Sequence, residues 1–170
     1  MQLSESTKEI LKNFSEINPN LVITPGKQLK TISTMKNILA TANVSEDFPQ
    51  DIAIYDLNEF LGVMSLFTKP TFAFDDKSLS ISEEGTSTKS KYYFADPSIL
   101  TVPQKDVKMP EAEVSFTLTE TDLTKVKKAA AMLQLPDISI SSKGSDIMLS
   151  AIDKKNDTAN NFSIKVGETN

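Results

Sequence analysis

Apolar residues recur with helical spacing in three segments of the chain. In the first segment, residues 4–17, they are Ile10, Leu11, Phe14 and Ile17. Their i, i+1, i+4, i+7 positions predict an amphipathic helix with one buried face. The sequence Asn18-Pro19-Asn20 then predicts the end of this helix, because proline cannot continue a helix and asparagine favours turns.

The second helix is predicted between residues 56 and 67. It begins with Asp56-Leu57-Asn58-Glu59, which has the form of a capping box. We therefore expect Asp56 to cap the helix and Glu59 to reach back to the Asp56 backbone N–H. The apolar face consists of Leu57, Phe60, Leu61, Met64 and Phe67. Gly62 lowers helix stability by roughly 1 kcal/mol relative to alanine, which predicts close packing against the helix at that position.

The third helix is predicted over residues 119–134. Its apolar face consists of Leu123, Val126, Ala130 and Leu133, and Leu135-Pro136 follows it. Short or alternating apolar runs between turn residues predict the strands. They span 21–24, 28–34, 38–44, 51–55, 71–74, 79–82, 89–94, 114–118, 138–141, 147–152 and 162–166, and Lys143-Gly144 forms a hairpin turn.

The order of these elements repeats along the chain. Helix, proline-bearing stop, strand, glycine turn, strand and strand occur from residue 4 and again from residue 120. This predicts an α+β protein with two domains of one topology, residues 1–108 and 109–170, joined through an extended segment at 96–111. The first half continues with a further strand, helix and strands, whereas the second does not. We therefore expect an incomplete second domain with an exposed sheet edge.

Composition narrows the chemistry that this chain can perform. It has 18 lysines and no arginine, histidine, cysteine or tryptophan, and its net charge is -5. The absence of cysteine and histidine excludes disulfides, thiolate metal sites and imidazole catalysis. Without arginine, anions must be bound by lysine, backbone N–H groups or helix N-termini. No apolar stretch approaches the ~20 residues of a membrane span, so we expect a soluble intracellular protein.

Lysines on the first and third helices are the strongest candidates for binding. Lys8 and Lys12 lie nearly opposite the apolar stripe of the first helix. On the third helix, Lys128 lies roughly opposite the stripe, with Lys125 beside it and Lys127 adjacent in sequence. Such lysines are usually only a solvated surface. Their equivalent placement on two helices favours an electropositive surface for nucleic-acid phosphate, bound without base readout.

The other motifs favour structural roles. Gly26-Lys27 lacks the earlier glycine of a phosphate-binding loop, and the loop 153–157 lacks the glycine of a calcium loop. The acidic pairs at 46–47, 75–76 and 83–84 fall in predicted loops, which argues against a carboxylate-dependent hydrolase. Tyr92-Tyr93-Phe94 is interpreted as strand core rather than a base-stacking platform. We therefore predict no catalytic residue, metal site or cofactor.

Specific residues resemble one family. The segment 51–66, with Ala53-Ile54-Tyr55-Asp56-Leu57-Asn58 followed by Phe60-Leu61-Gly62, resembles the strand-to-helix segment in the sliding clamps of T-even-type bacteriophages. Further matches are Leu3-Ser4, Leu11-Lys12-Asn13-Phe14, Ile17-Asn18, Ala42-Asn43, Ala95-Asp96-Pro97-Ser98, Asp122-Leu123 and Leu133-Gln134. The resemblance is strong to about residue 100 and thinner afterwards.

The resemblance implies a fold and a function. Members of the family are homotrimeric rings of two-domain subunits, with helices lining the hole and antiparallel sheets outside. The ring encircles duplex DNA and tethers the replicative DNA polymerase as a non-catalytic processivity factor. A clamp loader opens and closes it, and it serves as a coactivator for late transcription. By position, Lys12 and Lys128 match basic positions on inner helices, and the expected location is the cytoplasm of an infected bacterium.

The resemblance also directs attention to the connector. Because clamps generally receive partner tails near the interdomain connector, Ile99, Leu100 and Val102 are candidates for a partner-peptide site. Family members continue for roughly a quarter of their length beyond the equivalent of Asn170, and that portion supplies the fourth helix and the last strands of their second domain. The alternative is a clamp-like interaction or structural protein that forms no closed ring on DNA.

Overall fold

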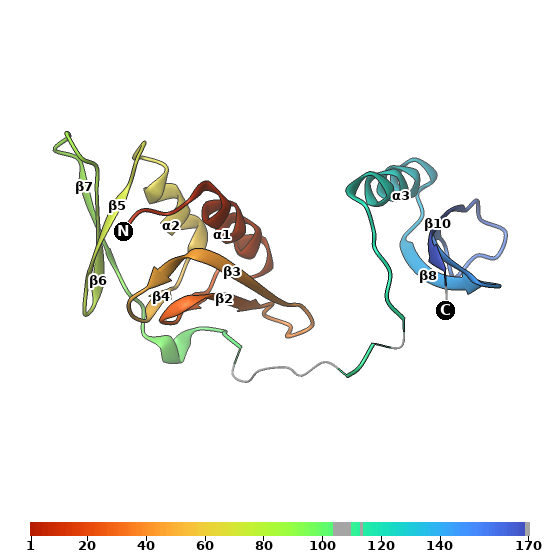
Figure 1. Ribbon diagram of the computed structural model, residues 1–170, viewed down its shortest axis with the longest axis horizontal. Coiled ribbons are helices and arrows are strands. Elements are labelled where there is room, and N and C mark those ends of the chain that lie inside the picture. Colours follow the sequence, from red (N-terminus) through yellow and green to blue (C-terminus); the bar gives the residue numbers. More distant parts are fainter. Residues whose placement is uncertain (104–109, 113, 169–170) are drawn as a thin grey trace. The chain divides into compact units, whose positions relative to one another are not determined.

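The computed structural model describes residues 1–103, 110–112 and 114–168. The chain divides into two compact units, Met1–Val107 (unit 1) and Lys108–Asn170 (unit 2) (Figure 1). Within the described residues, no helix combines the length and the apolar character needed to cross a membrane.

Two capped helices belong to unit 1. Helix α1 spans Glu5–Ile17, and the Ser4 hydroxyl at its N-terminus accepts a hydrogen bond from the Thr7 backbone N–H. Helix α2 spans Leu57–Met64, and the Asp56 carboxylate accepts hydrogen bonds from the backbone N–H groups of Asn58 and Glu59. Both helices follow the predicted apolar pattern, although α2 ends earlier than predicted. Asp56 caps α2 as predicted, but the Glu59 carboxylate does not accept the predicted hydrogen bond from the Asp56 backbone N–H.

All strand pairs in unit 1 are antiparallel. The strands are β1 (Leu21–Ile23), β2 (Gly26–Ile32), β3 (Leu39–Phe48), β4 (Ile52–Ile54), β5 (Thr71–Asp75), β6 (Ser78–Ser82) and β7 (Lys89–Tyr93). β1 pairs with β4, β2 with β3, and β6 lies between β5 and β7. The N-terminus extends the last of these sheets, because Met1 exchanges two backbone hydrogen bonds with Phe72, at 2.9 and 2.7 Å. A short 3-10 helix, η1 (Pro97–Ile99), follows β7.

The core of unit 1 lies between these strands and both helices. Its fully buried members include Leu11 of α1, Leu57 of α2 and Ile81 of β6. Phe60 packs edge-on against Tyr92, with ring centroids 5.1 Å apart. Burial raises the pKa of Tyr92, and the Glu59 carboxylate adds to the effect while the Asp56 backbone N–H opposes it. Tyr92 and Phe94 thus pack against the core as predicted, whereas Tyr93 is 68% exposed, so its assignment to the strand core is wrong.

A buried carboxylate, that of Glu46, joins β3 to the start of α1, so the acidic pair 46–47 lies in a strand and not in the predicted loop. Glu46 accepts hydrogen bonds from the Ser4 backbone N–H, from the Thr7 hydroxyl at 2.5 Å and from the Ser45 hydroxyl at 3.1 Å. Burial acts to raise the pKa of Glu46, but the hydrogen bonds from Thr7 and Ser4 outweigh it and lower the pKa to about 2. The ionised carboxylate thus satisfies donors at a helix N-terminus, where negative charge is favourable.

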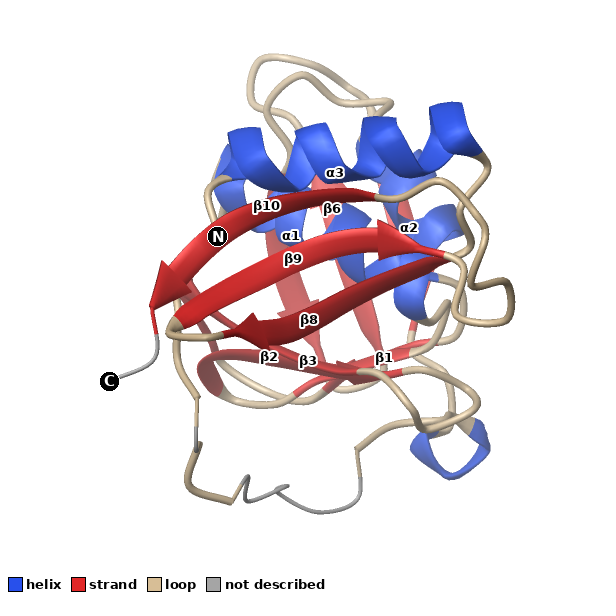
Figure 2. Ribbon diagram, turned by 90° about the vertical axis from the view of Figure 1, so that its right-hand side faces the viewer, coloured by secondary structure: helices blue, strands red, loops and turns tan. Residues whose placement is uncertain are grey.

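Unit 2 contains one helix and one sheet in its described residues. Helix α3 spans Glu120–Leu133, with the Thr119 hydroxyl as N-cap and Gln134 in the left-handed region at its end. The strands β8 (Asp137–Lys143), β9 (Asp146–Ile152) and β10 (Phe162–Glu168) form an antiparallel sheet in the order β10-β9-β8. Gly144, with φ of 64°, makes the turn between β8 and β9. Figure 2 shows α3 along the β10 side of this sheet.

The predicted strand at 114–118 is wrong, because its described residues form no ladder. Leu118 packs against the small core of unit 2, and Phe116 lies close to Gly167 of β10. In unit 1 the segment before the helix pairs at Phe72 of β5, the strand that follows the second helix. The described part of unit 2 has no second helix and no strand after one. Residues 114–118 have the apolar alternation of a strand, but no strand among the described residues pairs with them.

Two predictions about helix packing also need correction. Val126 of α3 is fully buried, but Leu123 and Leu133 are each 38% exposed. The helix packs mainly on β9 and β10, so the β8 part of the same sheet face is left open. Gly62 of α2 is not a close-packing site either, since a Cβ added there would meet no atom within 4 Å.

Candidate nucleic-acid interface

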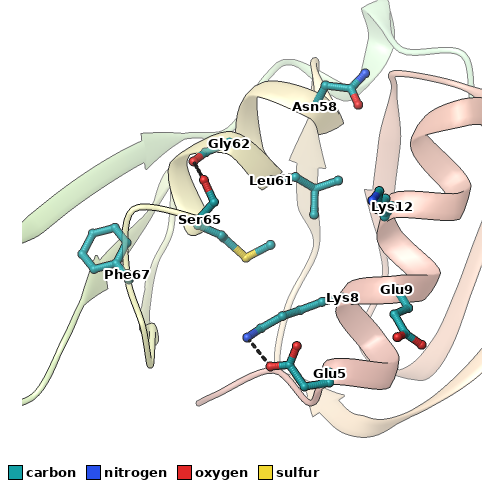
Figure 3. Close-up of a pocket in the computed structure, with 10 residues that line it drawn as sticks. Glu5, Lys8, Glu9, Lys12, Asn58, Leu61, Gly62, Ser65 and Phe67 are labelled. Atoms are coloured by element: carbon teal, nitrogen blue, oxygen red, sulfur yellow. Dashed lines mark hydrogen bonds and ion pairs between the residues drawn. The ribbon is translucent and has the colours of Figure 1, made fainter.

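A groove runs between α1 and α2 on unit 1 (Figure 3). Its volume is about 510 Å³. The residues that line it are Glu5, Lys8, Glu9 and Lys12 of α1, Asn58, Leu61, Gly62 and Met64 of α2, and Ser65 and Phe67 after α2. The floor is therefore largely apolar, whereas charged groups come from α1 alone.

The two predicted lysines of α1 both line this groove but differ in environment. Lys8 Nζ lies 2.7 Å from Glu5 Oε1, and the Lys8 side chain is only 27% exposed. Lys12 lies about one turn further along and is exposed. Among the described residues it has no ion-pair partner within 4 Å. With two carboxylates and two ammonium groups, the groove has balanced formal charge.

The contribution of α2 to the groove was not predicted. Asn58, Gly62 and Ser65 have i, i+4, i+7 spacing on the side of α2 away from its buried face. The Ser65 hydroxyl donates to the Gly62 carbonyl at 2.7 Å (Figure 3). These small or uncharged residues leave room and hydrogen-bonding groups beside Lys12. Their spacing is present in the sequence, but neither charge nor apolar periodicity distinguishes these residues from other exposed helix positions.

The lysines of α3 occupy an exposed surface of unit 2. Lys125, Lys127 and Lys128 are all exposed on either side of the buried Val126. Lys125 and Lys128 line a shallow hollow of about 370 Å³ with Glu120, Thr121 and Thr124. Lys125 Nζ is 3.9 Å from the Asp122 carboxylate, at the outer limit of an ion pair. The helix carries three lysines against Glu120 and Asp122, so its polar surface has an excess of positive charge.

The connector candidates differ in accessibility. Ile99 of η1 is 62% exposed, Val102 is half-buried, and Leu100 is 7% exposed. The Asn18 side chain donates to the Thr101 carbonyl at 2.8 Å, and Asn20 Oδ1 accepts from the Thr101 N–H at 3.0 Å. These bonds fix the segment against the turn after α1. Leu100 is thus not an exposed residue of a peptide site, whereas Ile99 is accessible.

The arrangement offers cations and hydrogen-bonding groups on helix surfaces. The described residues contain no group of three or more acidic, histidine or cysteine side chains that could hold a metal ion. The carboxylate with the strongly lowered pKa, Glu46, is occupied by donors of α1. What the helix surfaces can do is contact an extended anion through lysine, without base-specific recognition.

The fold is that of DNA clamps. The structure resembles that of a PCNA2-PCNA3 complex from Sulfolobus tokodaii, with a TM-score of 0.51 over 96% of this chain and 72% of that chain. Identity to this structure is 14%, so this likeness establishes the α+β fold alone.

Sequence comparison identifies the family. A family model for the DNA polymerase processivity factor matches residues 4–101. The sliding clamp of Vibrio phage KVP40 is 34% identical over 99% of this chain and 78% of its own length. The sliding clamps of Escherichia phage RB69 and Enterobacteria phage T4 are 32% and 33% identical, over 69% and 70% of their lengths. The chain belongs to the DNA polymerase processivity factor family, and its resemblance to phage sliding clamps is confirmed.

Proposed function

We propose that this chain is a subunit of a sliding clamp that encircles duplex DNA and tethers a replicative DNA polymerase. It acts as a non-catalytic scaffold in the infected bacterial host. Three copies form the ring, and a clamp loader places it on DNA. The observation that supports this proposal most directly is the match of residues 4–101 to the processivity factor family.

The lysine-bearing helix surfaces fit this role. We propose that Lys8 and Lys12 of α1 and Lys125, Lys127 and Lys128 of α3 face the DNA backbone. A closed ring is retained on DNA by topology and needs no tight or base-specific contact. Weak, exchangeable lysine–phosphate contacts therefore suit sliding, and their strength should fall with salt.

Partner tails are proposed to bind beside the connector. Ile99 supplies an exposed apolar side chain there. Leu100 and Val102 belong to the same proposed site, but Leu100 would reach a partner only after leaving its packed position. We propose that these tails belong to the DNA polymerase and to late-transcription factors that bind the clamp.

The test is a charge reversal of the helix lysines. The variant carries Lys8→Glu, Lys12→Glu, Lys125→Glu and Lys128→Glu, and the control carries Lys27→Glu, Lys69→Glu, Lys77→Glu and Lys89→Glu. Primer extension with the cognate polymerase and clamp loader measures product length. We expect short products with the first variant and long products with the control. Equal product lengths would refute the assignment of these helix surfaces to DNA.

Sedimentation tests the ring itself. The unmodified chain is expected to form trimers as its concentration rises. A strict monomer at high concentration would overturn the ring for this chain and favour a clamp-like interaction protein. For the two charge-reversal variants described above, circular dichroism spectra that match the spectrum of the parent would show that the fold is retained.

A further inference from the structure

Lys8 and Lys12 lie on the same helix and in the same groove, yet their surroundings differ. The Lys8 ammonium is 2.7 Å from the Glu5 carboxylate, and the two residues are one turn apart on α1 (Figure 3). Lys12 is exposed without such a partner among the described residues. The groove therefore presents one cation that is ready for an anion and one that is already engaged.

The groove holds the Lys8 side chain, whereas Glu5 lies on the exposed side of the pair. The Lys8 side chain is 27% exposed and lines the groove beside Leu61 and Met64, as expected for a lysine whose methylene stem covers apolar surface. Glu5 lies in the first turn of α1, where the helix dipole favours a carboxylate. The Glu5 side chain is 85% exposed, so it can move away from Lys8 without disturbing the core.

We infer that Glu5 is a positioning residue that occupies Lys8 in place of a DNA phosphate, so that Lys8 contacts DNA only by exchanging partners. The inference rests on the proposed function and deepens it. A carboxylate and a phosphate oxygen bind an ammonium group through the same charge-assisted hydrogen bond. Exchange between them replaces one contact with an equivalent one. Lys8 can thus follow the moving backbone without a large cost for each step.

The ion pair between Glu5 and Lys8 should also change how DNA binding depends on salt. A lysine that neutralises a phosphate releases condensed counterions, which contributes about 0.9 to the slope of log K against log salt concentration. Lys8 is already neutralised by Glu5 and leaves a free carboxylate behind when it turns to DNA. That carboxylate repels the phosphate and attracts a cation from solution. Lys12 should therefore account for most of the salt slope of α1.

Glu9 provides a matched control. It lies on the same helix and lines the same groove as Glu5, but it forms no ion pair among the described residues. Glu9→Gln and Glu5→Gln remove the same charge from the same groove. Only Glu5→Gln frees Lys8.

The experiment measures binding of the full-length chain to a short, fluorescently labelled linear duplex of mixed sequence, which a ring can enter from its ends. Fluorescence anisotropy is recorded between about 50 and 200 mM salt. We expect Glu5→Gln to tighten binding about two- to fivefold at low salt. We also expect it to steepen the salt slope by up to about 0.9 per engaged subunit. Glu9→Gln should leave the slope unchanged, and in a Lys8→Gln background Glu5→Gln should lose its effect.

The outcomes separate this inference from the proposed function. Equal slopes for Glu5→Gln and Glu9→Gln, or an undiminished effect of Glu5→Gln in the Lys8→Gln background, would overturn the inference. Lys12→Gln is expected to lower the slope in either case, because Lys12 is the available cation. If neither the parent chain nor any variant binds the duplex with salt dependence, the proposed DNA-facing surface fails instead. Helix content by circular dichroism should be the same in all variants.

Discussion

Unit 1 and unit 2 begin with the same order of elements, a capped helix followed by antiparallel strands, but they cover their sheets differently. In unit 1, α1 and α2 together enclose a large core that includes Leu11, Leu57 and Ile81. In the described part of unit 2, α3 alone covers β9 and β10, and only four residues form the buried cluster. Ile138 and Ile140 of β8 pair with the buried Ala151 and Leu149, yet they are 50% and 56% exposed.

One helix therefore covers only part of a three-stranded sheet. Paired residues in adjacent strands point to the same face, so Ile138 and Ile140 extend the apolar face that α3 covers elsewhere. In unit 1 the second helix, α2, helps α1 to cover the apolar faces of the sheets. The stability of unit 1 should therefore depend on core packing more strongly than that of unit 2.

The largest expected effect comes from Leu11→Ala in α1. Leu11 is fully buried, and removing it should lower the free energy of unfolding of unit 1 by about 2–5 kcal/mol. Leu123→Ala on α3 is the matched change, and we expect less than about 1 kcal/mol because Leu123 is 38% exposed. Amide hydrogen exchange on the full chain, resolved for each unit, measures both. Equal losses would contradict the proposed difference in core dependence.

The success of sequence-based prediction also differs between the units. Both ends of α1 and α3 could be predicted, because Ser4 and Thr119 are local N-caps, the apolar spacing is regular, and a proline follows each helix. The strand at 114–118 could not be judged locally, since a strand exists only where it pairs with another strand, and residues 114–118 pair with neither edge of the β10-β9-β8 sheet. The exposure of Leu123 could not be judged locally either, because it depends on which other elements cover α3. Apolar periodicity shows which side of a helix could be buried, but not whether another element covers it.

The candidate site shows a similar division. The spacing of Lys8 and Lys12 correctly predicted that they share one side of α1, because helix geometry fixes that relation. The Asn58–Gly62–Ser65 wall and the low exposure of Leu100 depend on tertiary packing. Gly62 was interpreted wrongly because a glycine that serves close packing and one that faces open space look the same in a sequence.

The next largest effect concerns the anchoring of the N-terminus of the first helix in each unit, α1 in unit 1 and α3 in unit 2. The N-terminus of α1 is bound by Glu46 from β3, whereas that of α3 is bound by Thr119 and Asp122 within the same segment. The pKa of Glu46 falls from 4.5 to about 2 on folding. The unfolded state therefore binds the proton more readily, and Glu46 stabilises unit 1 fully only above about pH 4.5. This contribution, on the order of 2–3 kcal/mol, should be lost as the pH falls from about 4.5 towards 2.

Glu46→Gln tests this anchoring. At neutral pH the substitution should lower the stability of unit 1 by most of that contribution, and between about pH 4.5 and 2 the gap between parent and variant should close. Glu16→Gln, a change of an exposed carboxylate on α1, is the control. Urea unfolding followed by circular dichroism at several pH values gives the comparison. A gap that stays constant through this pH range would show that the Glu46 carboxylate does not stabilise unit 1 by ionisation.

The smallest expected effect contrasts two glycines, one in each unit. A Cβ at Gly62 of α2 would meet no atom within 4 Å, so Gly62→Ala should stabilise unit 1 by about 0.5–1 kcal/mol through higher helix propensity. At Gly167 of β10, a Cβ would lie 3.3 Å from Phe116 Cβ and 3.4 Å from Ile147 Cδ1. Gly167→Ala should therefore destabilise unit 2 by about 1 kcal/mol unless Phe116 can move aside. Hydrogen exchange in each unit should shift in opposite directions. Stabilisation by both substitutions would contradict the predicted clash at Gly167 and would mean that the segment before α3 shifts away from β10 at little cost.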